Sequence, residues 1–149
     1  MAKSTKGTGA EEINTYKQIA VAVVHASAVG LGEVLKKYRS EAKRADVIRT
    51  YIDKIRFFPD QTGYFFVYTL DGVNIALPNP NAWQGKNLYD HQDSKGKYVV
   101  REVAEAAKKG GGFVEYYWPK PGAAGEQKKL SYAEPIPGTN YFIGAGFYI

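Results

Sequence analysis

The stretch from Gly63 to Pro80 constrains the fold more than any other part of the sequence. It reads GYFFVYTLDGVNIALPNP, two apolar runs separated by Asp71-Gly72, a dipeptide typical of a two-residue turn. This pattern predicts a β-hairpin. Alternate side chains of a strand share a face, so one face of the first strand should carry Tyr64, Phe66 and Tyr68. The other face should carry Phe65, Val67 and Leu70.

A long helix is predicted before the hairpin, over residues 11–38, because small and apolar residues recur there at steps of three and four. A heptad-like stripe of this kind predicts a parallel homodimer through the helix. Its members are Ile13, Tyr16, Ala20, Val23, Ser27, Gly30 and Val34. A second stripe beside it runs through Val21, Val24, Ala28, Leu31 and Leu35. The uncharged run 18–32 is shorter than the ~20 residues that span a bilayer, so we expect no membrane helix here.

The remaining elements predict an α+β fold. A second helix should start near Ala45 and end at Phe58-Pro59, since proline disfavours helix in the residue before it. A loop over 79–97, a helix over 97–109 and strands over 113–118, 129–133 and 141–149 follow. Short turns between strands indicate a PAS-like antiparallel sheet with helices packed on one face.

Length and composition indicate one domain. At 149 residues the chain is too short for two ordinary domains, and we place the domain at 11–149, with a body from about 45. Residues 1–10 have the composition of a flexible leader and lack the apolar stretch of a signal peptide. The absence of cysteine excludes disulfides and thiolate sites. The net charge of +5 is spread along the chain rather than gathered in a nucleic-acid arm.

Catalysis and metal binding have little support in the sequence. The two histidines, His25 and His91, lie in an apolar helix and in a loop, without ligand spacing. We therefore expect no enzyme, no metal site and no cofactor, and we interpret His25 as a helix-packing or interface residue.

Nucleic-acid binding is an alternative because KGGGFVEY, residues 109–116, matches much of an RNA-recognition strand. Gly111 stands where that pattern needs a stacking aromatic residue, and no helical segment follows the strand. The glycines are more simply a helix stop followed by a strand entry. RNA binding that weakens steeply with salt would restore this alternative.

Several motifs in combination resemble the single Cache sensor domains of bacterial receptors, a small PAS-like class. They are GYFFVYTLDG, LPNP, GGGFVEYYWPKPG, KKLSYAEPIPG and IGAGFYI. The resemblance covers about 51–149. It implies an extracytoplasmic, periplasmic ligand-binding domain of a chemoreceptor, a histidine kinase or a free-standing binding protein. Such domains usually recognise a small organic acid, and we expect the parent protein to be membrane-anchored. Members commonly have His at the position of Leu77 and Trp near Tyr141.

The residues are chemically compatible with that role. A carboxylate in a mostly apolar pocket needs convergent donors and a cation that offsets the cost of burying its charge. We expect the cations to be Arg56 and Lys129, with hydroxyls from Tyr64, Tyr68, Tyr116 and Tyr132. Phe66, Pro78 and Trp118 would form apolar walls, and the loop 79–93 would cover the ligand. Each aromatic residue is equally compatible with core packing, and each cation with a solvated surface. A ligand-free structural or interaction domain therefore remains an alternative.

Overall fold

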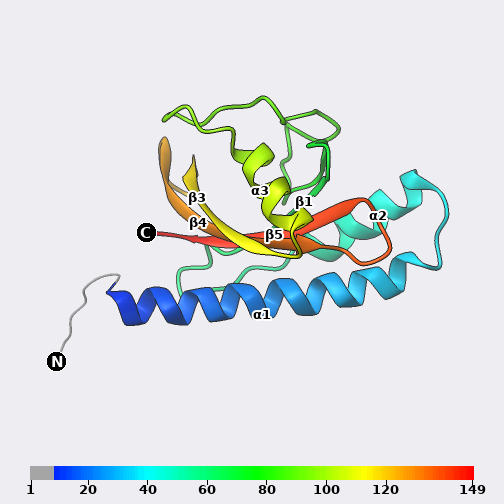
Figure 1. Ribbon diagram of the computed structural model, residues 1–149, viewed down its shortest axis with the longest axis horizontal. Coiled ribbons are helices and arrows are strands. Elements are labelled where there is room, and N and C mark those ends of the chain that lie inside the picture. The colour runs from blue at the N-terminus through cyan, green and yellow to red at the C-terminus, as the bar shows by residue number, and fades with distance from the viewer. Residues whose placement is uncertain (1–8) are drawn as a thin grey trace.

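The computed structural model describes residues 9–149 and has a five-stranded antiparallel sheet with helices on both faces (Figure 1). The helices are α1 (Ala10–Leu35), α2 (Glu41–Ile52) and α3 (Val99–Lys108). The strands are β1 (Phe65–Thr69), β2 (Asn74–Ala76), β3 (Gly112–Pro119), β4 (Glu126–Pro135) and β5 (Tyr141–Tyr148). Their spatial order is β2-β1-β5-β4-β3, so the last strand of the chain lies at the centre of the sheet.

The order of elements is the predicted one, with shifted helix ends. The first helix ends at Leu35 instead of residue 38, and the second ends at Ile52 rather than at Phe58. Ser40 caps α2, because its Oγ accepts the backbone N–H of Lys43 at 3.0 Å. Residues 1–8 of the predicted leader lie outside the described part of the chain.

The helices divide between the two faces of the sheet, and this corrects the expectation that they share one face. Residues of α1 and α2 form a core with Phe65, Val67 and Ile143. Residues of α3 form a second core with Phe66 and Phe142 on the opposite face. Figure 1 shows α1 running along one side of the sheet, with α3 and the 77–98 connection on the other.

The hairpin alternates as predicted, with one exception. Phe66 and Tyr68 belong to the core under α3, and Phe65 and Val67 belong to the core under α1. Leu70 packs with the α3 side instead of beside Val67. Strict alternation places Leu70 there, because it is an even number of residues from Phe66 and Tyr68, so its assignment to the face of Val67 was wrong.

The two stripes of α1 have different surroundings. The second stripe packs into the core: Val24, Ala28, Leu31 and Leu35 are buried. A dimer contact along the whole first stripe would require all of its residues to be exposed. Ala20 and Ser27 of this stripe are buried, so the stripe is not such a free surface. The exposed side of α1 instead carries small and aliphatic residues, namely Ala22, Ala26, Val29, Gly30 and Val34. By length and apolar composition alone, α1 is the one helix in residues 9–149 that could cross a membrane.

Candidate functional site

The centre of the site is the side chain of Lys129, which lies on β4 and is fully buried. In the register of the sheet Lys129 pairs with Tyr116 of β3 on one side and Tyr148 of β5 on the other. Residues directly opposite one another in antiparallel strands project to the same face. The three side chains therefore rise together on the α3 face.

The Lys129 ammonium group is surrounded by aromatic rings. Its Nζ donates a hydrogen bond to the Tyr64 hydroxyl at 3.1 Å and lies 4.2 Å from the centre of the Tyr64 ring. The ring centres of Tyr148 and Phe66 are 5.2 and 5.4 Å from Nζ. Such contacts between a cation and the face of a ring are attractive, most strongly where water is excluded.

Lys129 has no carboxylate partner in the described part of the chain. Seven ion pairs occur there, and none includes Lys129, although its neighbour Lys128 pairs with Glu115 at 3.4 Å. Burying a charge costs several kcal/mol unless a counter-charge and hydrogen bonds compensate it. The ammonium group uses one of its three N–H donors on Tyr64, so it can still donate to an anion.

Several tyrosines, most of them buried, lie on the same face of the sheet as this cation. Burial, and next the proximity of Tyr64, raise the pKa values of Tyr116 and Tyr148 well above the usual value, while a hydrogen bond to Ser131 opposes the rise at Tyr116. Burial likewise raises the pKa of Tyr68. The Tyr116 and Ser131 hydroxyls are 2.7 Å apart. These phenols are neutral at physiological pH and leave Lys129 as the charge of the site. The Tyr148 hydroxyl already donates to the carbonyl of Pro119 at 2.7 Å.

Two glycines of β5 provide space beneath these side chains. A Cβ added at Gly144 would lie 2.5 Å from Cε1 of Phe66, and one at Gly146 would overlap the Ser131 hydroxyl. Because neither residue has a Cβ, Phe66 and Ser131 can lie across the central strand. This explains why the IGAGFYI stretch forms the floor of the site.

Two spaces are lined by residues that contact Lys129, whose own side chain lines neither of them. The inner one, below α3, is a cavity of about 10 Å³. It is lined by Phe66, Tyr68, Leu77, Val99, Val100, Val103, Tyr116, Trp118 and Phe142. The outer one is an open groove of about 430 Å³. The groove is lined by Arg56, Tyr64, residues 77–83 and residues 118–121. Leu77 and Trp118 belong to both walls.

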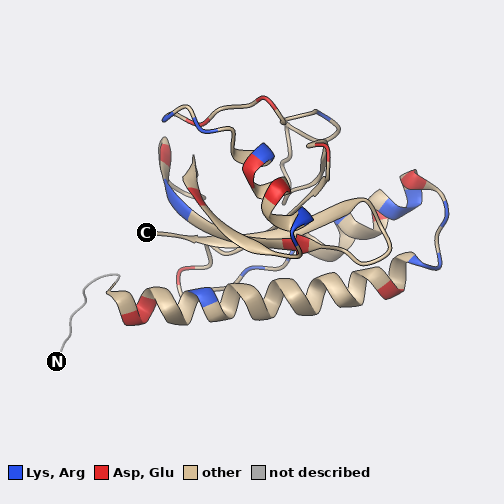
Figure 2. Cartoon of the chain, viewed as in Figure 1, with Lys and Arg blue, Asp and Glu red and all other residues tan. Residues whose placement is uncertain are grey.

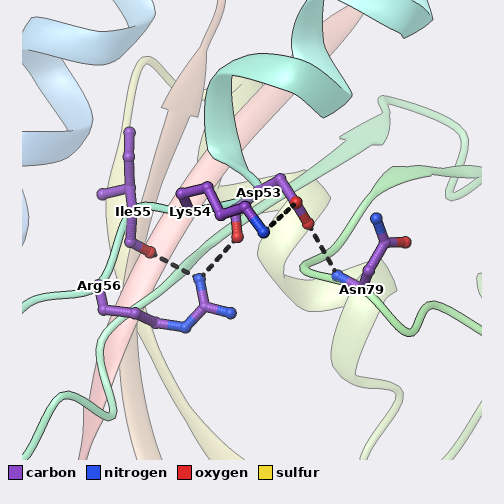
Figure 3. Close-up of polar contacts among 5 residues, drawn as sticks. All are labelled: Asp53, Lys54, Ile55, Arg56 and Asn79. Carbon is purple, nitrogen blue, oxygen red and sulfur yellow. Dashed lines mark hydrogen bonds and ion pairs between the residues drawn. The ribbon is translucent and has the colours of Figure 1, made fainter.

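The segment 77–83 is held over the site by hydrogen bonds from two elements. The Asp53 carboxylate, just beyond α2, accepts the backbone N–H of Asn79 at 3.1 Å, and this bond lowers the pKa of Asp53 (Figure 3). From β2, the Asn74 side chain accepts a hydrogen bond from the Asn81 amide at 2.9 Å. Asn81 in turn accepts the N–H of Trp83 at 3.0 Å. The Trp83 ring then packs edge-to-face on Trp118, with ring centres 5.0 Å apart.

Arg56 lies on the rim of the groove rather than inside the site, and its side chain is exposed. Figure 3 shows its guanidinium folded back on the main chain, where one Nη1 donates to the carbonyls of Asp53 and Ile55 at 3.0 and 2.9 Å. Its Nε and Nη2 atoms make no such bonds within residues 9–149. Arg56 can therefore contact a molecule in the groove but not one confined beside Lys129.

Six of the predicted site residues gather on the α3 face. These are Tyr64, Phe66, Tyr68, Tyr116, Trp118 and Lys129. Pro78 lies in the groove wall. Tyr132 is not brought to the site, because it is an odd number of residues from Lys129 along β4 and faces α1. Its hydroxyl donates to Glu134 at 2.8 Å, and burial together with that bond raises its pKa to about 12.

Sequence reasoning missed Tyr148, Leu77 and Trp83 as site residues. Tyr148 could have been found, because alternation along β5 places it on the same face as Phe142. Trp83 lies in a loop, and its contact with Trp118 spans 35 positions of the chain, for which periodicity carries no signal. Of the histidines, His25 contacts Glu134 of β4 through Nδ1 at 2.8 Å, and His91 packs against Trp83 and Trp118. Within residues 9–149 no three His, Cys, Asp or Glu side chains could hold a metal together.

A partly enclosed site over one face of an antiparallel sheet, with a long helix across the other face, is typical of a ligand-binding sensor domain. A family model, dCache_2, described as a Cache domain, matches residues 3–149. The chain belongs to the Cache domain family.

Relatives and solved structures agree with this assignment. The chain is 38% identical over 87 residues, 58% of its length, to the sensor histidine kinase MctS of Rhizobium johnstonii. It is 30% identical over 127 residues, 81% of its length, to the methyl-accepting chemotaxis protein CtpM of Pseudomonas aeruginosa. The matched regions cover only 19% and 22% of these proteins, so the chain spans about a fifth of its curated relatives.

Two solved structures superpose over nearly the whole chain. A methyl-accepting chemotaxis protein from Vibrio parahaemolyticus has a TM-score of 0.79 at 29% identity and covers 93% of this chain and 92% of its own. A Cache chemosensory domain described for its carboxylic acid recognition has a TM-score of 0.78 at 26% identity, with coverages of 95% and 99%. The fold is therefore the PAS-like Cache fold. The domain is a periplasmic or otherwise extracytoplasmic sensor domain of the kind found in chemoreceptors and histidine kinases. The Cache family consists of sensor domains rather than enzyme domains.

Proposed function

We propose that this sensor domain recognises a small organic acid whose carboxylate pairs with Lys129. The observation that carries the proposal is the buried ammonium group, which lacks an acidic partner in the described chain. A bound carboxylate would supply the missing counter-charge, and charge-assisted hydrogen bonds of this kind are about twice as strong as neutral ones. The solved neighbour described for carboxylic acid recognition supports the same ligand class.

The acid would displace the Tyr64 hydroxyl from Lys129 or share the ammonium group with it. Lys129 has no exposed surface, so a ligand reaches it only if a side chain moves. Tyr64 is the candidate for that movement, because it lies in the groove wall and holds Lys129 by one hydrogen bond. Acetate, propionate, lactate and pyruvate are acids of the proposed class.

The proposal extends to signalling by the parent protein. A ligand shifts an equilibrium between two states only by its difference in affinity for them. Closure of the groove around the acid would favour one arrangement of the sheet relative to α1. A parallel homodimer through the exposed side of α1 would then pass the change to a chemotaxis or kinase module of a membrane-anchored parent.

A thermal-shift screen against acids and their neutral amides tests the ligand class. The pairs acetate and acetamide, and propionate and propionamide, have nearly the same shape and differ in charge. An acid at a hundred times its dissociation constant should add about 2.7 kcal/mol to the free energy of unfolding. For a domain of this size the gain is several degrees of Tm. Equal shifts with acid and amide, or none with any acid, would favour the ligand-free interaction domain instead.

A further inference from the structure

The inner cavity and the outer groove are separated by two side chains, Leu77 and Trp118, which line both. Trp118 is held on several sides by rings, with centres 5.0 Å from Trp83, 5.8 Å from Tyr116 and 5.9 Å from His91. Leu77 is only half-buried and follows the short edge strand β2. Of the two side chains that separate the spaces, Leu77 is therefore held less tightly by its neighbours than Trp118.

Lys129 lies between residues that line the two spaces, although its own side chain lines neither. Its Nζ bonds to Tyr64, a residue of the groove wall, and lies 5.4 Å from the ring centre of Phe66, a residue of the cavity wall. A carboxylate on Lys129 can therefore direct the rest of its acid into the cavity or out into the groove.

The two directions differ in chemistry. The cavity wall consists of aliphatic and aromatic side chains, whose polar groups are the hydroxyls of Tyr68 and Tyr116 and the indole N–H of Trp118. An alkyl tail gains free energy by leaving water for such a surface. The groove is open to solvent and carries Arg56, Asn79, Asn81 and Lys120 in its wall, so an alkyl tail there would stay largely hydrated. An alkyl tail should point inward.

The cavity also sets a limit of size. Its volume of about 10 Å³ corresponds to roughly one water-sized sphere, which is also about the size of a methyl group. In propionate the methylene group would lie next to the carboxylate at Lys129 and only the methyl group would enter the cavity. Each further methylene group would have to push against Leu77, which closes the cavity toward the groove.

We propose that Leu77 is a specificity-determining residue that restricts this sensor to acids with short alkyl tails, such as acetate and propionate. The inference rests on the proposed function, because it takes the carboxylate to be on Lys129. Replacing Leu77 by alanine joins the cavity to the groove and lengthens the space available to a tail.

Calorimetric titration with acetate, propionate, butyrate and valerate tests this inference on the wild-type domain and on Leu77→Ala. One methylene too many in a hydrophobic pocket costs roughly 10- to 200-fold. The wild-type Kd should therefore rise about tenfold or more between propionate and butyrate. In Leu77→Ala, butyrate and valerate should bind at least as tightly as propionate. Leu88→Ala is the matched control, because Leu88 is buried in the same core but lines neither space. It should keep the wild-type order.

The outcomes separate the two proposals. If Leu77→Ala binds acids in the wild-type order, the role of Leu77 is wrong and the carboxylate site stands. If the wild-type domain binds no acid, the proposed function itself fails. Tighter binding of succinate than of propionate, lost in Arg56→Ala, would show that the tail points into the groove and would overturn the inference. Should Leu77→Ala not fold, as judged by circular dichroism, Leu77→Val must show a smaller change in the same direction.

Discussion

Two cations predicted for the same role, Lys129 and Arg56, have opposite environments. Lys129 is fully buried among rings, whereas Arg56 is exposed at the groove rim. Exposed charges are screened by salt and contribute little to binding, while a desolvated charge interacts strongly with its partner. Lys129 should therefore dominate the affinity for a carboxylate, with Arg56 acting on molecules that occupy the groove.

Asp93 is a buried carboxylate with a structural role on the same side of the sheet. It accepts the backbone N–H groups of Lys95, Lys97 and Tyr117, each at 2.9 Å, and so fixes the 93–97 turn to β3. Burial alone would raise the pKa of Asp93, but the three hydrogen bonds together outweigh it and hold the pKa below its usual value.

The lowered pKa of Asp93 predicts a pH-dependent contribution to stability. An unfolded aspartate titrates near 3.9, so below about pH 4 the unfolded chain binds the proton more readily and stability falls. The contribution is complete above the unfolded pKa and disappears as pH falls through the folded one. Asp93→Asn should reduce the free energy of unfolding by about 1–3 kcal/mol at pH 7. Urea titrations should show this difference shrinking below pH 4, and a difference that does not change with pH would contradict the prediction.

The sequence correctly predicted which face of the sheet a side chain occupies whenever strand alternation was applied strictly. Alternation places Tyr116 and Trp118 on one face, and Lys129 shares that face with Tyr116 in the observed register. Tyr132 was assigned to the site against the same rule, and it faces α1 instead. The exposure of Arg56 could not have been predicted, because it depends on how the segment after α2 folds back on itself.

At the level of elements, α1 presents an exposed face that could contact a second copy of the chain. Figure 2 shows that the charged residues of α1 lie toward its two ends. On the exposed side of α1, Val29 and Val34 are 45% and 42% exposed. They lie near Ala22, Ala26 and Gly30, with the exposed side chains of His25 and Glu33 beside them. Small residues allow two helices to approach closely along such a face.

If α1 forms the proposed dimer contact, a charge introduced on its exposed face should prevent dimerisation. The wild-type domain should dimerise as its concentration rises in analytical ultracentrifugation. Ala26→Glu should keep it monomeric, because two glutamates would face one another in an apolar contact. Ala124→Glu, the same change in an exposed turn, is the control and should dimerise normally. A wild-type domain that stays monomeric at high concentration would contradict a dimer of the isolated domain.

The order and type of all elements followed from local patterns, but their arrangement did not. Apolar periodicity and Gly or Pro signals identified three helices and five strands in the described chain. The position of β5 between β1 and β4 depends on pairings between distant residues, such as Phe66 with Gly144. The packing of α3 on the face opposite α1 is equally non-local, so the sequence alone did not reveal the two-sided core.

Across the whole molecule, β4 connects the candidate site with the long helix. Lys129 projects from β4 toward the site, and Glu134 projects from its other face and contacts His25 of α1 at 2.8 Å. A shift of β4 on ligand binding would therefore be felt at α1 through a polar contact as well as through packing. In the proposed mechanism, a change at the site therefore reaches α1 through a single strand, β4.

The most direct test compares Lys129→Met with Lys128→Met, two identical changes at neighbouring positions of β4. Lys129→Met should weaken calorimetric binding of the best acid about thirtyfold or more, because truncating one partner of a buried charge pair costs 2 kcal/mol or more. Without ligand it should unfold at the same or a higher temperature than the wild type, since an apolar side chain is less costly to bury than an unpaired charge. Lys128→Met should bind like the wild type. A Lys129→Met domain that still binds the acid with wild-type affinity would contradict the assignment of Lys129 as the carboxylate partner.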